Sequence, residues 1–256
     1  MTPPAIETAQ LTRMFGSFCA VNALDLKVEA GKFYGFLGPN GAGKSTTIKM
    51  LTGLLAPTTG SIRILGHDIS DPDQALEVKR RIGVVPENLS LFDNLTAREY
   101  LVFIGRMYLL PPKTVRDRAE ELLVLMKLEN EEKKLTLEYS HGMRKKLALA
   151  AALIPNPDLL FLDEPFEGVD AVTSRVLRIM LKRCVDRGAT IFLTSHVLEI
   201  VEKLCTDVGI IAQGKLVQQG SMDEMRREGS LEERFLELVG GDHHESQQLS
   251  WLEGEG

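Results

Sequence analysis

The sequence has few cysteines and no long apolar run. Its 256 residues include three cysteines, Cys19, Cys184 and Cys205, none in a CxxC pair. The odd number excludes a full disulfide framework within one chain, so reduced core thiols of a cytosolic protein are expected. The most apolar stretch, Leu147 to Leu162, is broken by two prolines, an asparagine and an aspartate. It therefore falls short of the roughly 18 apolar residues of a membrane helix, and any membrane role requires a partner.

Signs of secretion and of nucleic-acid binding are also lacking. Met1 to Gln10 has no basic region followed by an apolar segment, so a signal peptide is not expected. The formal net charge is −6 and the pI about 5.5, whereas nucleic-acid-binding proteins usually carry a basic stripe. The short basic clusters Lys79-Arg80-Arg81 and Arg144-Lys145-Lys146 are interpreted as solvated faces. No nucleic-acid partner is predicted.

Strand and helix patterns alternate on both sides of a helical middle. Two apolar runs, Leu159 to Leu162 and Ala189 to Thr194, suit parallel strands buried on both faces. Helical spacing dominates residues 94–152, which predicts a helical lobe inserted into an α/β core. Further segments are assigned as strands (Val21 to Val28, Lys32 to Leu37, Ser61 to Leu65, Arg81 to Val85), helices (Ser45 to Leu55, Val172 to Arg187, Ser230 to Val239) and a hairpin (Gly209 to Gln218).

A glycine-rich segment after the strand at Lys32 to Leu37 matches GxxxxGK[ST]. Glycines let the backbone curl so that successive N–H groups point inward, and the following helix offers its positive end. Lys44 supplies charge for the β- and γ-phosphates, and Ser45 a hydroxyl for Mg²⁺. A chance glycine loop is the alternative, but the strand–loop–helix context favours a P-loop. Its residues are Gly38, Pro39, Asn40, Gly41, Ala42, Gly43, Lys44 and Ser45.

Two strand ends carry further candidates. Asp163 and Glu164 follow one buried strand, and ligands of parallel sheets gather at the carboxyl ends of strands. Asp163 is expected to hold Mg²⁺, and Glu164 to polarise an attacking water. The plain alternative is a solvated acidic turn. His196 ends the next strand, where a γ-phosphate contact competes with a purely structural role.

From Ile6 to Val239 these segments, in this order, resemble the ATP-binding-cassette (ABC) family. The resemblance adds a Q-loop, an adenine-stacking aromatic residue, a signature sequence, a D-loop and a switch histidine. The matching segments are Val85-Pro86-Glu87, Arg13-Met14-Phe15-Gly16 with Phe15 as the stacking ring, Tyr139-Ser140-His141-Gly142-Met143, Glu167-Gly168-Val169-Asp170 and Thr194-Ser195-His196, with the P-loop extended to Thr46.

The resemblance implies a P-loop NTPase core with a mainly parallel sheet, an N-terminal antiparallel β subdomain and the inserted helical lobe. Residues 1–240 would form the nucleotide-binding domain and 241–256 a disordered tail. It also implies a Mg²⁺-dependent ATPase whose two copies pair head to tail, so that Ser140, His141 and Gly142 meet the partner's ATP. A separate permease would hold the subunit on the cytoplasmic face of the plasma or inner membrane.

Two positions depart from the family pattern. Glu87 replaces a usual glutamine, which keeps an oxygen for Mg²⁺ but loses the amide donor. His141 replaces the first signature glycine, while Ser140 and Gly142 are kept, so activity is expected to survive. Similar Pro-Glu and Tyr-Ser-x-Gly-Met sequences occur in bacterial ABC-2 export-type transporters, which favours export.

Three other functions compete with transport. A soluble ABC ATPase acting on a macromolecular assembly usually carries tandem cassettes, coiled coils or basic extensions, which this sequence lacks. A small-molecule kinase would leave the signature stretch without a role. A non-hydrolysing sensor would most readily lose Glu164, which is present.

Overall fold

The computed structural model describes residues 2–131, 133–227 and 229–239. Its centre is a six-stranded sheet in the order β11-β10-β4-β9-β8-β7, parallel except for β11. The predicted tail, 241–256, lies outside the described residues. The strands are β4 (Phe33–Leu37), β7 (Ile82–Val85), β8 (Leu159–Asp163), β9 (Thr190–Ser195), β10 (Asp207–Ala212) and β11 (Lys215–Ser221).

The N-terminal segment forms a second, antiparallel sheet, as predicted. The single strand expected at Val21 to Val28 is two strands, because the run is interrupted at Asp25 and Leu26, where the Leu26 N–H donates to Thr8 Oγ1 rather than to a strand backbone. The ten-residue strand β1, which pairs with both of them, was missed. The strands are β1 (Ile6–Phe15), β2 (Phe18–Leu24), β3 (Lys27–Val28), β5 (Thr59–Ile64) and β6 (His67–Asp68).

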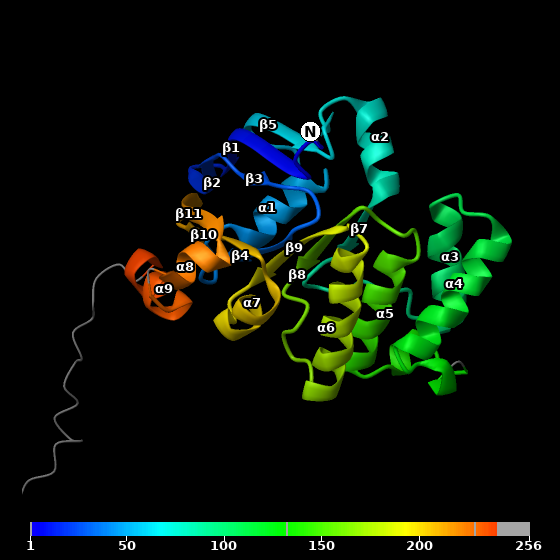
Figure 1. Cartoon of the computed structure of the whole chain (residues 1–256). Helices are drawn as coiled ribbons and strands as arrows, with labels where there is room; N and C mark the ends of the chain where they lie inside the picture. Colours follow the sequence, from blue (N-terminus) through cyan, green and yellow to red (C-terminus); the bar gives the residue numbers. More distant parts are fainter. Residues whose placement is uncertain (1, 132, 228, 240–256) are drawn as a thin grey trace, which may run out of the picture.

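Helices cover both faces of the main sheet (Figure 1). Helices α5, α6 and α7 lie on one side, α1 and the antiparallel sheet on the other, and α3 and α4 beyond the β7 edge. The helices are α1 (Lys44–Leu51), α2 (Pro72–Arg81), α3 (Ala97–Met107), α4 (Pro112–Leu125), α5 (His141–Leu153), α6 (Ala171–Asp186), α7 (Leu198–Leu204), α8 (Met222–Arg227) and α9 (Leu231–Val239), with 3₁₀ turns at Glu129–Glu131 and Thr136–Glu138.

Helix boundaries follow local capping chemistry. Helix α1 ends four residues before the predicted Leu55, since Gly53 has φ of 72° and leaves the helical region. Helix α3 begins with a reciprocal capping box between Thr96 and Glu99. Helix α2 was not predicted, although Asp71 before Pro72 is a typical start signal.

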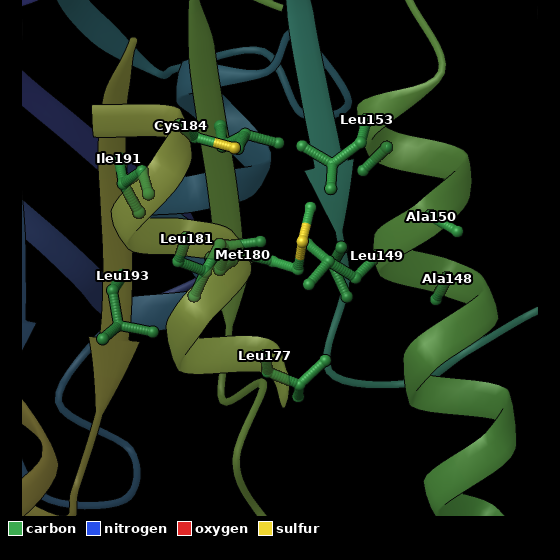
Figure 2. Close-up of a cluster of buried hydrophobic side chains, with 14 of the residues drawn as sticks. Ala148, Leu149, Ala150, Leu153, Leu177, Met180, Leu181, Cys184, Ile191 and Leu193 are labelled. Atoms are coloured by element: carbon green, nitrogen blue, oxygen red, sulfur yellow. The ribbon is translucent and has the colours of Figure 1, made fainter. Parts of the chain in front are cut away.

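The buried strands of the main sheet separate two hydrophobic cores. Along β9, Phe192 enters the core beneath the antiparallel sheet, where it contacts Tyr34, Phe36 and Phe161. Ile191 and Leu193 enter the core on the other face. Figure 2 shows this second core, in which side chains of α5 and α6 pack over the sheet together with Ile191 and Leu193 of β9. The predicted burial of these strands on both faces is confirmed.

The sequence also led to expectations about membrane helices and about the cysteines. In the described part of the chain no helix is long and apolar enough to span a membrane. The thiols are free, with Cys184 and Cys205 buried in the core and Cys19 half-buried.

Candidate active site

The glycine-rich loop joins β4 to α1 and encloses a cavity. Gly43 has φ of 107°, and a Cβ there would lie 2.5 Å from the carbonyl oxygen of Ala20, so only glycine fits. No side chain caps the start of α1. Its first-turn N–H groups and its dipole therefore favour an anion at this end.

Lys44 is buried beneath this loop. Its Nζ donates hydrogen bonds to the carbonyl oxygens of Gly38 (2.7 Å) and Pro39 (3.2 Å). The same nitrogen lies 3.6 Å from Oε1 of Glu164. The cavity beside it has a volume of about 350 Å³, enough for a polyphosphate group. It is lined by Phe18, Ala20, Asn40, Gly41, Gly43, Lys44, Ser45, Thr46, Glu87 and Glu164; the remaining loop residues, Gly38, Pro39 and Ala42, are outside this lining set.

The strand-end acids lie where the sheet topology predicts. Asp163 ends β8 and is buried, and its Oδ1 accepts a hydrogen bond from Thr194 Oγ1 at 2.6 Å. His196, just beyond β9, places Nδ1 3.1 Å from Oε2 of Glu164. Oε1 of Glu164 is buried without a hydrogen-bond partner in the described structure. This oxygen pairs with Lys44 Nζ but keeps an acceptor position for a water or ligand in the cavity, which fits a site that handles water and nucleotide.

The peptide unit of Glu164 is fixed on both sides. Its φ of 47° is in the left-handed region, which is uncommon for a residue other than glycine. Its N–H donates to Thr194 Oγ1 at 3.1 Å, and its carbonyl oxygen accepts from Lys145 Nζ at 2.9 Å. Lys145 is only 2% exposed, so its assignment to a solvated basic face was wrong.

The buried ammonium of Lys145 lies among acidic groups. Burial lowers its pKa, and the nearby carboxylates of Glu167, Glu164, Glu87 and Asp163 oppose that shift. Because α5 carries Lys145 to the end of β8, the basic cluster in the sequence is divided between solvent and core. Composition alone could not show which residue of this basic cluster is buried.

Oxygen donors suited to Mg²⁺ lie beside the loop. Ser45 Oγ donates to Glu87 Oε2 at 3.4 Å, which places both oxygens at the cavity wall. In the described ranges no three His, Cys, Asp or Glu side chains form a ready metal cluster. Mg²⁺ at phosphate sites commonly uses one or two carboxylates together with substrate oxygens, so this donor set fits.

The signature residues lie apart from this cavity. Ser140 caps α5 and is exposed; its Oγ accepts the N–H of Met143 at 3.3 Å, which leaves its own O–H free to donate. The His141 ring packs on Gly168, 3.3 Å from where a Cβ would be. Asp170 caps α6, and hydrogen bonds from Thr173 hold the pKa of its carboxyl below the usual value. Ser140, His141, Gly142 and Asp170 thus form one surface, away from the cavity of their own chain.

Two phenylalanines share a hairpin next to the loop. Phe15 and Phe18 pair in register between β1 and β2. Phe18 is 62% exposed and lines the cavity, whereas the ring of Phe15 lies under the guanidinium of Arg13, 4.6 Å from its centroid. The sequence motif indicated Phe15 and not Phe18. Recognising a hairpin turn at Gly16-Ser17 in the sequence would have predicted that the rings of Phe15 and Phe18 lie side by side.

Residues 21–167 match the sequence profile described as "ABC transporter". The chain belongs to the ABC transporter family. It is therefore an ABC ATPase with the P-loop NTPase fold, as the motifs predicted.

Known ABC proteins match over most of the chain. The daunorubicin/doxorubicin resistance ATP-binding protein DrrA of Streptomyces peucetius is 41% identical over 223 residues, covering 87% of this chain and 67% of that protein. The bacitracin transport ATP-binding protein BcrA of Bacillus licheniformis is 38% identical over 242 residues, covering 94% and 76%. A solved ATP-binding subunit of an ABC transporter superposes with a TM-score of 0.85 at 30% identity, covering 91% and 99%.

Proposed function

We propose that this ABC ATPase is the subunit that drives export through a separate membrane permease, by ATP-dependent head-to-tail pairing of two copies. One observation carries the proposal. The cavity holds Lys44 and Glu164 but lacks Ser140 and Gly142, which are displayed elsewhere on the same chain. A site built from both sets requires a second copy. The relatives named above for drug resistance and for bacitracin transport support the transport role.

Each predicted site residue has a proposed task. Loop N–H groups and Lys44 bind the phosphates, and Glu164 accepts a proton from the attacking water. His196 contacts the γ-phosphate and orients Glu164, while Phe15 stacks on adenine. Mg²⁺, when bound, neutralises charge on the phosphate oxygens. The residues that would hold it are Ser45, Asp163 and Glu87.

The partner copy completes the site. Ser140 donates its O–H and Gly142 its N–H to the γ-phosphate bound by the other chain, and the start of α5 favours that anion. Asp170 lies on the same surface and lines the contact between copies. Residues 1–240 form the nucleotide-binding domain, with 94–152 as its lobe. Hydrolysis removes the shared phosphate, so the two copies separate.

An apolar groove offers the surface for the permease. It has a volume of about 400 Å³ and lies between α2, β7 and the end of α3. Leu54, Leu76, Met107 and Leu109 line it, and each is more than half exposed. Exposed apolar groups gathered around a groove favour a protein contact, here a cytoplasmic helix of the permease. The subunit would thereby be peripheral on the cytoplasmic face of the plasma or inner membrane.

Glu164→Gln tests the hydrolytic cycle. The amide cannot take the proton, so turnover should fall by about a hundredfold or more and an ATP-bound dimer should accumulate. ATPase rate and molar mass by light scattering, with ATP and Mg²⁺, give both readouts. Lys44→Ala is the control, because it should weaken nucleotide binding and give no dimer. An unchanged rate in Glu164→Gln would contradict the proposal.

A photo-crosslinking residue at Met107 tests the permease contact. Crosslinks in native membranes should join it to a protein with several membrane spans. The same probe at Val124, an equally exposed apolar position on α4 outside the groove, should give none. Crosslinks from Met107 to soluble assemblies alone would instead favour an ABC ATPase without a transport role.

A further inference from the structure

Lys145 of α5 is a buried cation that is absent from the cavity lining. Its Nζ reaches the carbonyl oxygen of Glu164 at 2.9 Å. A buried lysine is costly to keep unless its donors and charge are used. The hydrogen bond to Glu164 therefore indicates that Lys145 has a role in holding Glu164.

The geometry of Glu164 depends on a small set of contacts. Its left-handed backbone is held by Thr194 on the N–H side, and by Lys145 and the N–H of Glu167 (3.2 Å) on the carbonyl side. Among the hydrogen bonds described, Lys145 provides the side-chain donor on the carbonyl side. Since φ and ψ at this residue aim the carboxylate at Lys44 and His196, releasing the carbonyl lets the carboxylate turn away.

Lys145 also connects two surfaces of the molecule. It lies five residues after the cap Ser140 on the same helix, about 7.5 Å along the axis at 1.5 Å per residue. At the helix tip, Gly142 packs against Asp170 and Thr173, so the segment after Glu164 is held by α5 at both ends. A shift of α5 is thereby passed to the carboxylate.

We propose that Lys145 is a positioning residue for ATP hydrolysis: its hydrogen bond to the Glu164 carbonyl aims the carboxylate into the cavity and ties it to the helix tip that meets the partner's nucleotide. The inference rests on the proposed head-to-tail cycle. Lys145 does not line the cavity. Its loss should therefore affect the rate of the chemical step more than nucleotide affinity.

Two substitutions separate the hydrogen bond from the charge. Lys145→Met keeps the volume and removes the donor, so kcat should fall about tenfold to a hundredfold while the KM for ATP stays within about twofold. Lys145→Gln is neutral but keeps an N–H donor, so it should recover most of the rate. Lys146→Met, at the neighbouring half-buried lysine, is the matched control and should behave as the unsubstituted chain.

Dimer formation distinguishes positioning from a structural role. With ATP and Mg²⁺, Lys145→Met should accumulate the ATP-bound dimer, as Glu164→Gln does, and keep its thermal midpoint. A normal kcat in Lys145→Met would overturn the inference, as would joint loss of the dimer and of thermal stability. If Glu164→Gln traps the dimer and Lys145→Met does not, the inference alone fails. If Glu164→Gln gives no dimer, the proposed cycle fails, and the kcat and KM comparison still decides the role of Lys145.

Discussion

Single residues at the cavity are defined by what their side chains contact rather than by their type. Glu164 is held between Lys44 and His196, and Ser45 and Glu87 share a hydrogen bond. The GxxxxGK[ST] spacing and the acids at the strand end indicated most of these positions in the sequence, because both patterns are typical of phosphate sites. Phe18 and Lys145 were not identified, because hairpin register and helix packing place them.

The two hairpin phenylalanines permit a residue-scale prediction. Stacking on a base is worth about 1–3 kcal/mol per base in aromatic-to-alanine replacements, so Phe15→Ala should weaken ATP binding about five- to a hundredfold. Phe18→Ala, measured in parallel, gives the contribution to ATP binding of the ring that lines the cavity. Titration calorimetry with ATP and with inorganic tripolyphosphate gives the readout. Equal losses for both ligands would exclude stacking, because tripolyphosphate has no base.

At the scale of elements, the sequence pattern predicted the strands that have a regular burial pattern. Strands β8 and β9 and the hairpin β10–β11 lie where apolar runs and a Gln-Gly turn indicated. Strand β1 was missed because its burial alternates irregularly through register shifts against its neighbours. Such shifts depend on contacts distant in sequence. Helix α7 is short, and its Val201 side chain packs against Gly35 of β4, which no local pattern reveals.

Strand β9 gives a prediction about stability. Phe192 is fully buried and contacts three other aromatic rings, so Phe192→Ala should lower the free energy of unfolding by about 3–5 kcal/mol. Chemical denaturation measures it. Val124→Ala, on the exposed face of α4, should change stability by no more than about 0.5 kcal/mol. Similar losses in the two variants would contradict the core assignment.

At the scale of the whole molecule, the nucleotide cavity and the signature surface are separate features of one chain. The order of motifs predicted both, but only the folded chain shows that Ser140 is excluded from its own cavity. The proposed pairing of two copies would create two equivalent composite sites, each with a P-loop from one chain and a helix tip from the other.

A mixed dimer tests this arrangement. Ser140→Ala and Lys44→Ala chains should each lose about a hundredfold of the rate alone. Mixed together they should recover activity, because the intact P-loop of the Ser140→Ala chain meets the intact signature of its partner. The control mixes unsubstituted chain with the double variant, where no composite site is intact in the mixed pair. If the signature acted within its own chain, the first mixture would show no recovery.

The ion pair between Lys44 and Glu164 gives the cavity an internal counter-ion. In the proposed cycle, a triphosphate that pairs with Lys44 would displace the Glu164 carboxylate, which would then be available as a proton acceptor. Nucleotide binding and release of the Glu164 carboxylate would then be one exchange of ion-pair partners. While this ion pair is intact, the charge of Lys44 is compensated, so other anions are attracted less strongly than they would be by the loop alone.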